Sequence, residues 1–374
     1  MMKDNKDNIC HVTTVHPRYD IRIFEKECKS LLKYYSVQLI VADGLGDETK
    51  EGIRIADVGK EIHRIRSMVI SPWKTYKIIK NTGTKVIHLH DPELIPIGIL
   101  LKIRGYKIIF DIHEDIYEQI KIKDWIPGIV KFLLLPLIKI FNIIVSFNFN
   151  LIFAELSYIK SYSNSKNKYQ TDVLNYPQTK ILKHFINNNR TENGIIYVGS
   201  ITNLRGLDII LDALMILKKN KVDFKMHFVG ILKEDIDWEY YKSIREHIKF
   251  YGYLGIKNAY KISIECKVGL AILKPVGNYI ESIPTKIFEY RAVHLPFIAS
   301  DFKAWKDYFP KAKDSLYINP QSPLDLSKAL TQLLLENGAL THSGDCNQKE
   351  VIHKFTWESE EKKLITIYEN ILFD

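Results

Sequence analysis

Residues 277–291 read GNYIESIPTKIFEYR and contain two glutamates, Glu281 and Glu289, that are separated by seven residues. Pro284 stands just before an apolar-periodic run. Proline suits the first turn of a helix because its missing N–H would have no partner there. The pattern therefore predicts a helix that begins at Pro284, with Glu281 in the preceding loop and Glu289 on the helix.

Lys286 falls in the first turn of this expected helix. The positive end of the helix dipole disfavours a cation there, unless an anion binds together with it. Free N–H groups and the dipole make such a helix end a phosphate site. A solvated lysine is the simpler alternative, so the local pattern alone leaves the phosphate site as a hypothesis.

The same stretch resembles the donor-site signature of retaining GT-B glycosyltransferases of family four, the glycosyl transferases group 1. The resemblance rests on Glu281 and Glu289 within IPTKIFEYRA and on the following strand PFIAS. It implies that Glu289 binds the ribose hydroxyls of a nucleotide, that Glu281 faces the transferred sugar, and that Thr285 and Lys286 belong to the donor site. The family usually has a glycine where this chain has His294, which leaves the tightness of the following turn open.

Length and charge set the broad class of the protein. A chain of 374 residues is typical of two domains, each with its own core. The formal charge of +9 suits nucleic acid, an anionic membrane surface or phosphorylated substrates. The chain has no zinc-knuckle, helix-turn-helix or RNP-like pattern, so nucleic acid is the least favoured of these partners.

Cysteine usage and the first residues predict a cytoplasmic protein. The four cysteines form no CxxC pair and are expected to be free thiols in a reducing compartment. They are Cys10, Cys28, Cys266 and Cys346. The opening residues, MMKDNKDN, lack the apolar core of a signal peptide.

Short apolar strands alternate with helical stretches in both halves of the chain, which predicts parallel sheets with helices on both faces. Two such Rossmann-like domains facing a central cleft are the GT-B fold that the resemblance implies. We expect an acceptor-binding domain over residues 1–185 and a nucleotide-sugar-binding domain over 186–355. Residues 356–374 should form a helix that crosses back onto the first domain. The expected elements include a strand over Asp172–Tyr176 and a helix over Trp238–His247.

The first strand-to-helix turn of the second domain, residues 197–208, reads YVGSITNLRGLD. Gly199 ends the strand and Arg205 stands where the helix begins. Ligands of open parallel sheets bind outside the carboxyl ends of the strands, so we expect Arg205 and Lys286 to hold one diphosphate from two sides. The stretch also resembles the family's diphosphate-binding loop, although many members carry a further arginine where this chain has Ser200. An exposed loop arginine is the alternative reading of Arg205.

Two expected strands of the first domain end in histidine. His113 follows the strand ending in FDI and resembles the family's strand-end histidine, which lies beside the sugar and helps to shape the reaction centre. His90 ends the string IHLH, which resembles a recurring family motif, and is expected to line the acceptor cleft. A structural histidine is the alternative in each case. Asp91 is expected to cap the helix that follows His90.

The first loop contains HPRYDIR, whose spacing of histidine, aspartate and arginine resembles a subgroup of the family that acts on surface polysaccharides. This resemblance makes His16, Asp20 and Arg22 candidates for the acceptor side of the site. The residues alone leave open whether Asp20 and Arg22 pair with each other or contact an acceptor.

Residues 125–141, WIPGIVKFLLLPLIKIF, belong to the most apolar segment of the chain. A membrane-spanning helix needs about 18 or more apolar residues with few charges, whereas Lys131, Lys139 and Pro136 interrupt this run. A core helix is one alternative. The other is an interfacial helix on an anionic leaflet, which apolar bulk with basic flanks favours. Family members that extend lipid-linked glycans dock in this way, so we expect a peripheral protein on the inner face of the plasma membrane.

No DxD motif ends a strand and no His/Cys spacing matches a zinc site, so no metal ligands or cofactor are expected. The resemblance implies a metal-independent retaining transferase that moves a hexose from a nucleotide diphosphate sugar to a hydroxyl. The expected acceptor is a lipid-linked glycan in O-antigen or capsule synthesis, and the catalytic residues are His113 and Glu281. A GT-B-fold sugar-nucleotide epimerase and a non-catalytic assembly protein remain the alternatives.

Overall fold

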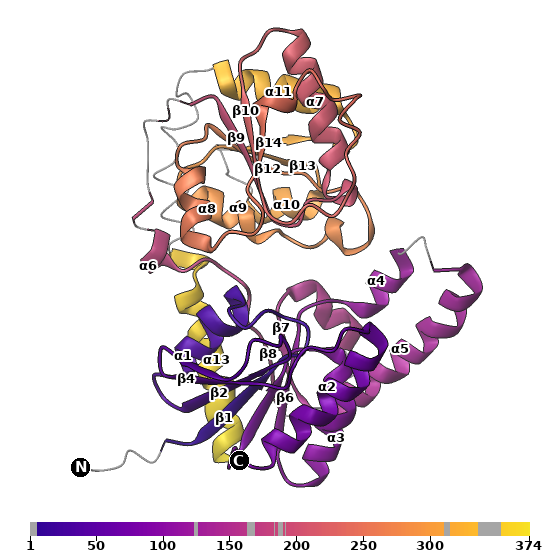
Figure 1. Ribbon diagram of the computed structural model, residues 1–374, viewed down its shortest axis with the longest axis vertical. Coiled ribbons are helices and arrows are strands. Elements are labelled where there is room, and N and C mark those ends of the chain that lie inside the picture. Colours follow the sequence, from indigo (N-terminus) through magenta and orange to yellow (C-terminus); the bar gives the residue numbers. More distant parts are fainter. Residues whose placement is uncertain are drawn as a thin grey trace. The chain divides into compact units, whose positions relative to one another are not determined.

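The computed structural model describes residues 6–122, 126–162, 169–182, 184–185, 190, 192–309, 315–335 and 353–374. The chain forms two compact units (Figure 1). Unit 1 comprises Met1–Asn175 and Trp357–Asp374, and unit 2 comprises Tyr176–Thr356. Each unit is built around a parallel sheet, as the alternation of strands and helices predicts.

Within the described residues, unit 1 has an eight-stranded sheet in the order β3-β4-β2-β1-β5-β6-β7-β8. All pairings are parallel except that of β3 with β4. The strands are β1 (Asn8–Val12), β2 (Ser36–Val41), β3 (Glu48–Lys50), β4 (Ile53–Asp57), β5 (Val86–Leu89), β6 (Lys107–Ile112), β7 (Asn150–Phe153) and β8 (Gln170–Asp172). The helices are η1 (Ile21–Cys28), α1 (Lys29–Leu31), α2 (Arg64–Ile79), η2 (Pro92–Leu94), α3 (Ile95–Ile103), α4 (Ile116–Ile122), α5 (Gly128–Asn148), η3 (Leu156–Tyr162) and α13 (Trp357–Phe373).

Successive residues of these strands face two different cores, because side chains alternate across a sheet. Cys10 and Val12 of β1 pack in a cluster with residues of α2, α3 and α5. Ile9 of the same strand packs in a second cluster with residues of η1, α1 and α13. The C-terminal helix α13 therefore completes the core of unit 1, with the indole of Trp357 only 2% exposed.

Unit 2 has a six-stranded, all-parallel sheet in the order β11-β10-β9-β12-β13-β14 within the described residues. The strands are β9 (Gly194–Val198), β10 (Lys225–Val229), β11 (Ile248–Phe250), β12 (Val268–Ala271), β13 (Phe297–Ser300) and β14 (Ser315–Ile318). The helices are α6 (Thr179–Leu182), η4 (Asn203–Arg205), α7 (Leu207–Lys219), η5 (Arg245–His247), α8 (Ile256–Ser263), η6 (Gly277–Ile280), α9 (Thr285–Ala292), α10 (Lys303–Tyr308) and α11 (Pro323–Leu335).

Two expected elements differ in the structure. The helix expected over Trp238–His247 is a series of turns that ends in η5, and Asp237 starts it by accepting hydrogen bonds from two backbone N–H groups. The strand expected over Asp172–Tyr176 ends at Asp172 as β8. It stops there because the N–H of Leu174 donates to the Glu360 side chain of α13 rather than to a strand.

The division between the units falls after Asn175 rather than after residue 185. Leu182 of α6 is buried, and the ring of Phe185 lies 5.6 Å from that of Tyr260 in unit 2. These apolar contacts place Leu182 and Phe185 in unit 2.

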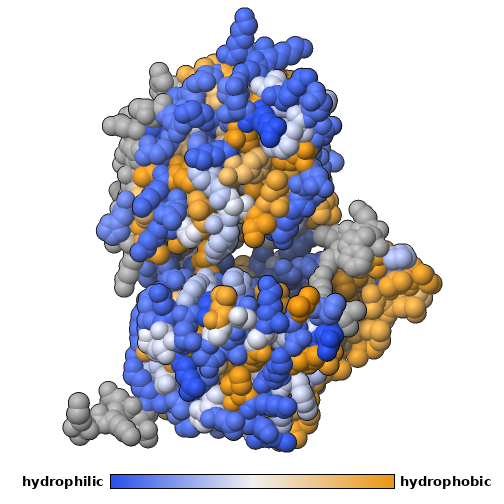
Figure 2. Space-filling model, in the orientation of Figure 1, coloured by the Kyte–Doolittle hydropathy of each residue, from blue (hydrophilic) through white to orange (hydrophobic). Residues whose placement is uncertain are grey.

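Helix α5 exposes most of its apolar side chains. Its mean hydropathy is 2.1 over the most apolar 18 residues, of which only 11% are buried. By length and composition it is the one helix among the described residues that could cross a membrane. Figure 2 shows the hydrophobic surface that gathers over this helix.

Candidate functional site

The carboxyl edge of the unit 2 sheet gathers a glycine and two cations. The chain leaves β9 at Gly199, where φ is +127°, a value that side chains rarely adopt. A Cβ atom at Gly199 would lie 3.4 Å from Nζ of Lys286 and 3.9 Å from Nη1 of Arg205. The absence of a side chain at Gly199 therefore leaves space beside both cations.

Arg205 is placed by the turn that follows β9. Thr202 caps η4, since its Oγ1 accepts a hydrogen bond from the N–H of Arg205 at 3.2 Å. Gly206 then takes the left-handed conformation, with φ +79°, and α7 begins. The guanidinium carbon of Arg205 lies 5.7 Å from the ring centroid of Tyr279, a cation–π contact.

The amino group of Lys286 is buried without a hydrogen-bond acceptor in the described part of the chain. Its side chain is 6% exposed, and Nζ lies 3.6 Å from the ring centroid of Tyr197. Nζ has no hydrogen-bond partner among the residues that the structure describes. Burial lowers the pKa of Lys286 well below its ordinary value, and Arg205 lowers it further, whereas Glu289 opposes the shift. A buried ammonium in this position is stabilised if an anion binds beside it.

Helix α9 supplies the other side of this site. It begins at Thr285, no side chain caps it and its first turn holds no acid. The first N–H groups of a helix have no acceptor within it and can bind an anion. In α9 these are the N–H groups of Thr285 and Lys286, because the N–H of Ile287 donates to the carbonyl of Pro284 at 3.0 Å. The indole N–H of Trp305 donates to the carbonyl of Ser282 at 2.8 Å and holds the loop before the helix.

The two glutamates flank the start of α9. Glu281 is exposed at the end of η6, in the loop, as the sequence predicts. Glu289 is half-buried on α9, and burial together with its carboxylate raises the pKa of Tyr260 well above the ordinary value. His294, where the family usually has glycine, adopts a φ of +57°, so it keeps the left-handed conformation of the turn.

The carboxyl edge of the unit 1 sheet brings several predicted histidines together. His113 is half-buried, and its Nε2 lies 2.9 Å from Oδ2 of Asp111 and 3.1 Å from Nδ1 of His90. The ring centroid of His16 lies 4.9 Å from that of His113. Burial tends to lower the pKa of His16, but Asp20 and Asp91 together raise it above its ordinary value.

Arg22 and His90 are not at a surface of unit 1, contrary to the expectation that they face an acceptor. Both are buried, with exposures of 4% and 2%. Arg22 makes two hydrogen bonds of 2.9 Å to the Asp111 carboxylate, which sequence reasoning missed. Asp20 does not pair with the Arg22 side chain, because its Oδ1 accepts from the backbone N–H groups of Arg22 and Ile23 and caps η1.

Asp91 occupies the N-cap position of η2, as the sequence predicts, but its side chain has another role. Its side chain makes no capping hydrogen bond to η2. Instead, Oδ2 accepts from Thr13 Oγ1 at 2.9 Å and from the N–H of Thr14 at 2.5 Å. Asp91 therefore fixes the first loop, where His16 and Asp20 lie.

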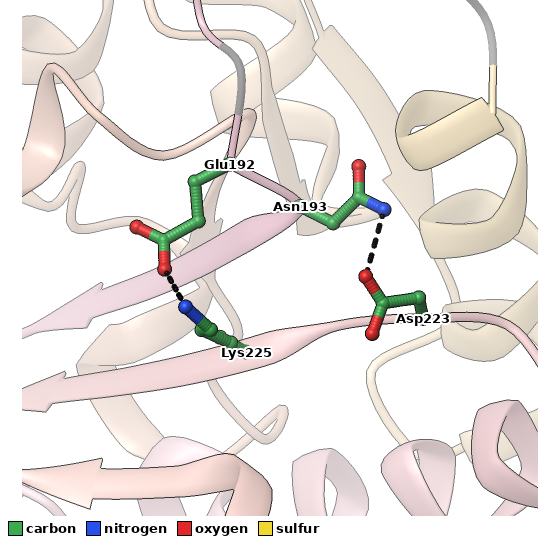
Figure 3. Close-up of a pocket in the computed structure, with 4 residues that line it drawn as sticks. All are labelled: Glu192, Asn193, Asp223 and Lys225. Carbon is green, nitrogen blue, oxygen red and sulfur yellow. Dashed lines mark hydrogen bonds and ion pairs between the residues drawn. The ribbon is translucent and has the colours of Figure 1, made fainter.

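A shallow polar pocket in unit 2 lies at the opposite edge of the sheet (Figure 3). Its lining residues precede or begin β9 and β10, so they stand at the amino ends of these strands. Glu192 pairs with Lys225 at 2.8 Å, and Nδ2 of Asn193 donates to Asp223 at 3.3 Å. Because these groups satisfy one another, the pocket is a weaker candidate than the carboxyl edge.

The second half of the chain resembles known proteins in sequence. Residues 179–350 match the family described as Glycosyl transferases group 1. An uncharacterized glycosyltransferase of Methanocaldococcus jannaschii is 19% identical over 216 residues. That match covers 56% of this chain and 53% of the relative, so this chain spans about half the length of the curated protein that it matches.

Solved structures match over nearly the whole chain. Sucrose-phosphate synthase from Thermosynechococcus elongatus superposes with a TM-score of 0.74 at 14% identity, covering 98% of this chain and 99% of that one. Anabaena HepE in complex with UDP-glucose gives a TM-score of 0.69 at 9% identity, covering 97% and 99%. These likenesses show that the fold is GT-B, as the sequence predicts.

We predict that Arg205→Ala and Lys286→Met each weaken the binding of a nucleoside diphosphate by about 1.5–3 kcal/mol, the usual worth of a hydrogen bond to a charged group. Binding of the bare nucleoside should hardly change. Calorimetric titration of both ligands is the measurement. Lys303→Ala is the matched control, because Lys303 is exposed and pairs with Asp307 on its own helix. Unchanged diphosphate affinity in the two variants would rule out the grip from two sides.

Proposed function

We propose that this chain, whose residues 179–350 form a Glycosyl transferases group 1 domain, is a retaining glycosyltransferase that moves a hexose from a nucleotide diphosphate sugar to a hydroxyl. The observation that carries the proposal is the buried ammonium of Lys286, which has no hydrogen-bond acceptor among the described residues and lies near Arg205. Two cations at the start of α9 match the charge of a diphosphate.

The diphosphate is the leaving group of such a transfer, and negative charge develops on it as the glycosidic bond breaks. Arg205, Lys286 and the first N–H groups of α9 are fixed before the reaction, so they stabilise this charge without reorganising. In a front-face mechanism, the departing phosphate oxygen takes the proton of the acceptor hydroxyl. Glu289 accepts hydrogen bonds from the ribose hydroxyls, while Glu281 and His113 orient the sugar.

The donor most strongly supported for a first test is a UDP-sugar, because Anabaena HepE is seen in complex with UDP-glucose. The transfer proposed here needs no metal ion at the diphosphate, since cationic side chains and a helix end meet its charge. A sugar-nucleotide epimerase would use the donor alone, and an assembly protein would turn over no donor.

The acceptor that we propose is a lipid-linked glycan of a surface polysaccharide, and the support comes from α5. Apolar side chains cover its exposed surface. They are Ile129, Val130, Phe132, Leu133, Leu137, Ile140, Ile143, Ile144 and Phe147. Lys139 is exposed beside them, and Lys131 donates to the carbonyl of Lys121 at the start of the helix. Apolar bulk beside lysines favours contact with an anionic leaflet.

Helix α5 is better suited to lie on a membrane than to cross it. The strands before and after it, β6 and β7, are neighbours in one sheet, so both ends of the helix belong to the same unit. Val145 near its C-terminal end is buried in the core of that unit. Pro136, Lys131 and Lys139 also interrupt the apolar run. The protein proposed here is cytoplasmic and peripheral to the inner face of the plasma membrane.

We predict that Glu289→Gln raises the KM for the donor about tenfold or more, because the variant loses the charge that accepts from the ribose hydroxyls. His113→Ala should lower kcat more than it raises the donor KM. Glu239→Gln, an exposed glutamate of the same unit as Glu289, is the control.

The assay follows transfer from UDP-sugars, and NMR reads the anomeric configuration of the product. Brief addition of EDTA should not change the rate. Donor conversion without acceptor would favour the epimerase, and no turnover with any nucleotide sugar would favour the assembly protein.

We predict that the protein floats with vesicles of anionic phospholipid at low salt, and that Phe132→Ser with Leu137→Ser weakens this binding at least about tenfold. Lys131→Glu with Lys139→Glu should weaken it as well, and added salt should have less effect on this second variant. Leu324→Ser, an equally exposed leucine of unit 2, is the matched control. Absence of vesicle binding, or equal binding by all variants, would contradict membrane docking and favour a soluble acceptor.

A further inference from the structure

One face of the unit 1 sheet carries histidines in place of apolar core residues. In the pairing of β1 with β5, His11 stands opposite His88. His90 follows two residues after His88 and so points to the same face. Glu27 comes from η1, which packs over this face. All four side chains are buried, with exposures of 0% for His11, Glu27 and His88 and 2% for His90.

The facing atoms of three of these residues have the spacing of metal ligands. Nδ1 of His11 lies 2.9 Å from Nε2 of His90. Oε2 of Glu27 lies 3.8 Å from the first atom and 3.9 Å from the second. In a triangle with these edges, the point equidistant from the corners lies about 2.1 Å from each, the usual length of a Zn–N or Zn–O bond. A ligand atom of His88 lies within 4.8 Å of the other three.

Several polar atoms of this cluster have no hydrogen-bond partner in the part of the chain that the structure describes. Nε2 of His88 and both carboxylate oxygens of Glu27 have no hydrogen-bond partner among the described residues. Nε of Arg22 lies 3.0 Å from Oε1 of Glu27. Its N–H donates to Asp111 instead of to Glu27. Leaving three buried polar atoms unsatisfied is costly, and coordination of a cation by Glu27 and His88 would reduce this cost.

The outward nitrogen of each imidazole is already engaged by a neighbour. The hydroxyl of Tyr368 on α13 lies 2.8 Å from Nδ1 of His88 and 3.2 Å from Nε2 of His11. Nδ1 of His90 lies 3.1 Å from Nε2 of His113. These contacts leave Nε2 of His88, Nδ1 of His11 and Nε2 of His90 as the nitrogens that are available to an ion within the cluster. Metal-binding histidines are usually held in this way through their second nitrogen.

We propose that unit 1 binds one divalent transition-metal ion, with Zn²⁺ as the first candidate, through His11, Glu27, His88 and His90. Three imidazoles and one carboxylate suit Zn²⁺, and four protein ligands with no exposed position are typical of a structural site. The ion would tie β1, β5 and η1 together. The site belongs to unit 1 and does not depend on the proposed transfer, whose diphosphate is bound by residues of unit 2.

The competing arrangement is a hydrogen-bonded cluster without an ion. In that cluster, Nε2 of His90 donates to Nδ1 of His11. Burial and Asp111 raise the pKa of Glu27 well above its ordinary value, which favours the neutral acid. That arrangement explains the 2.9 Å contact between the two imidazoles. It leaves Nε2 of His88 without a partner among the described residues.

The test is the metal content of the purified full-length chain, produced with Zn²⁺ in the medium and then dialysed against chelator. We expect about one equivalent of Zn²⁺ per chain by elemental analysis. Production with Co²⁺ instead should give the visible absorption bands of a four-coordinate Co²⁺ site. Glu27→Gln and His88→Gln should hold less than about a tenth of the wild-type metal, whereas His63→Gln, an exposed histidine of the same unit, should hold the full amount.

Tyr368→Phe keeps all four ligands and removes only the hydroxyl that orients two of them, so it should weaken metal affinity about 10–100-fold. If the ligand variants fail to fold, the Co²⁺ spectrum of the wild-type chain still decides the question. A folded wild-type chain that holds no stoichiometric Zn²⁺ or Co²⁺ would overturn the proposal in favour of the hydrogen-bonded cluster. Full metal content in folded Glu27→Gln and His88→Gln would overturn the choice of ligands.

Discussion

The ammonium of Lys286, buried on the ring of Tyr197 without an acceptor among the described residues, is the constraint on which the rest of the unit 2 site depends. A cation in that position destabilises the fold unless a negative charge compensates it. Every neighbouring feature leaves room for such a charge. Gly199 lacks a side chain where one would contact Nζ, and the first turn of α9 has neither a cap nor an acid. We interpret the site as built to bind an anion.

In unit 1, a buried ion pair positions the residue that the sequence singles out. Arg22 and Asp111 form a buried pair with two hydrogen bonds, and Asp111 also contacts His113. The π-helix η1, a form that often occurs at functional sites, contributes Arg22 and Glu27 to this region. The half-buried His113 is therefore held in one orientation by a fully buried layer, which suits a residue that orients a substrate.

The sequence predicts the features that depend on local pattern. Alternating strands and helices predict the parallel sheets, and a proline followed by an apolar-periodic run predicts α9, which the structure begins one residue later at Thr285. The gathering of Arg205 and Lys286 follows because both stand after strands of one parallel sheet. The residue pattern around Arg205 and Lys286 and the topology of a parallel sheet both place these two side chains at the carboxyl edge.

Features that depend on strand register could not be predicted in this way. His11 and His88 are far apart in the chain and meet only because β1 pairs with β5 in one register. The pattern His-x-His in a strand is a signal that two side chains share a face, but it does not reveal Glu27 above them. Arg22 looked like a loop residue at a surface, whereas the turn capped by Asp20 directs it into the core. Asp91 stands at the N-cap position that the sequence predicts, but its carboxylate accepts from the N–H groups of residues 14 and 15 instead of from η2. The sequence does not reveal this competition for the carboxylate.

The most direct test of the central claim is to count the protons that nucleoside diphosphate binding takes up. Free Lys286 has a pKa well below its ordinary value of 10.5, and an adjacent diphosphate should raise it. At a pH between the lowered and the ordinary value, binding should therefore take up a proton, which calorimetry in buffers of different ionisation enthalpy detects. We predict net uptake by the wild-type chain and none by Lys286→Met. Binding without proton uptake over this whole range, or equal uptake by the variant, would contradict the account of Lys286 as a buried amino group whose charged form the diphosphate stabilises.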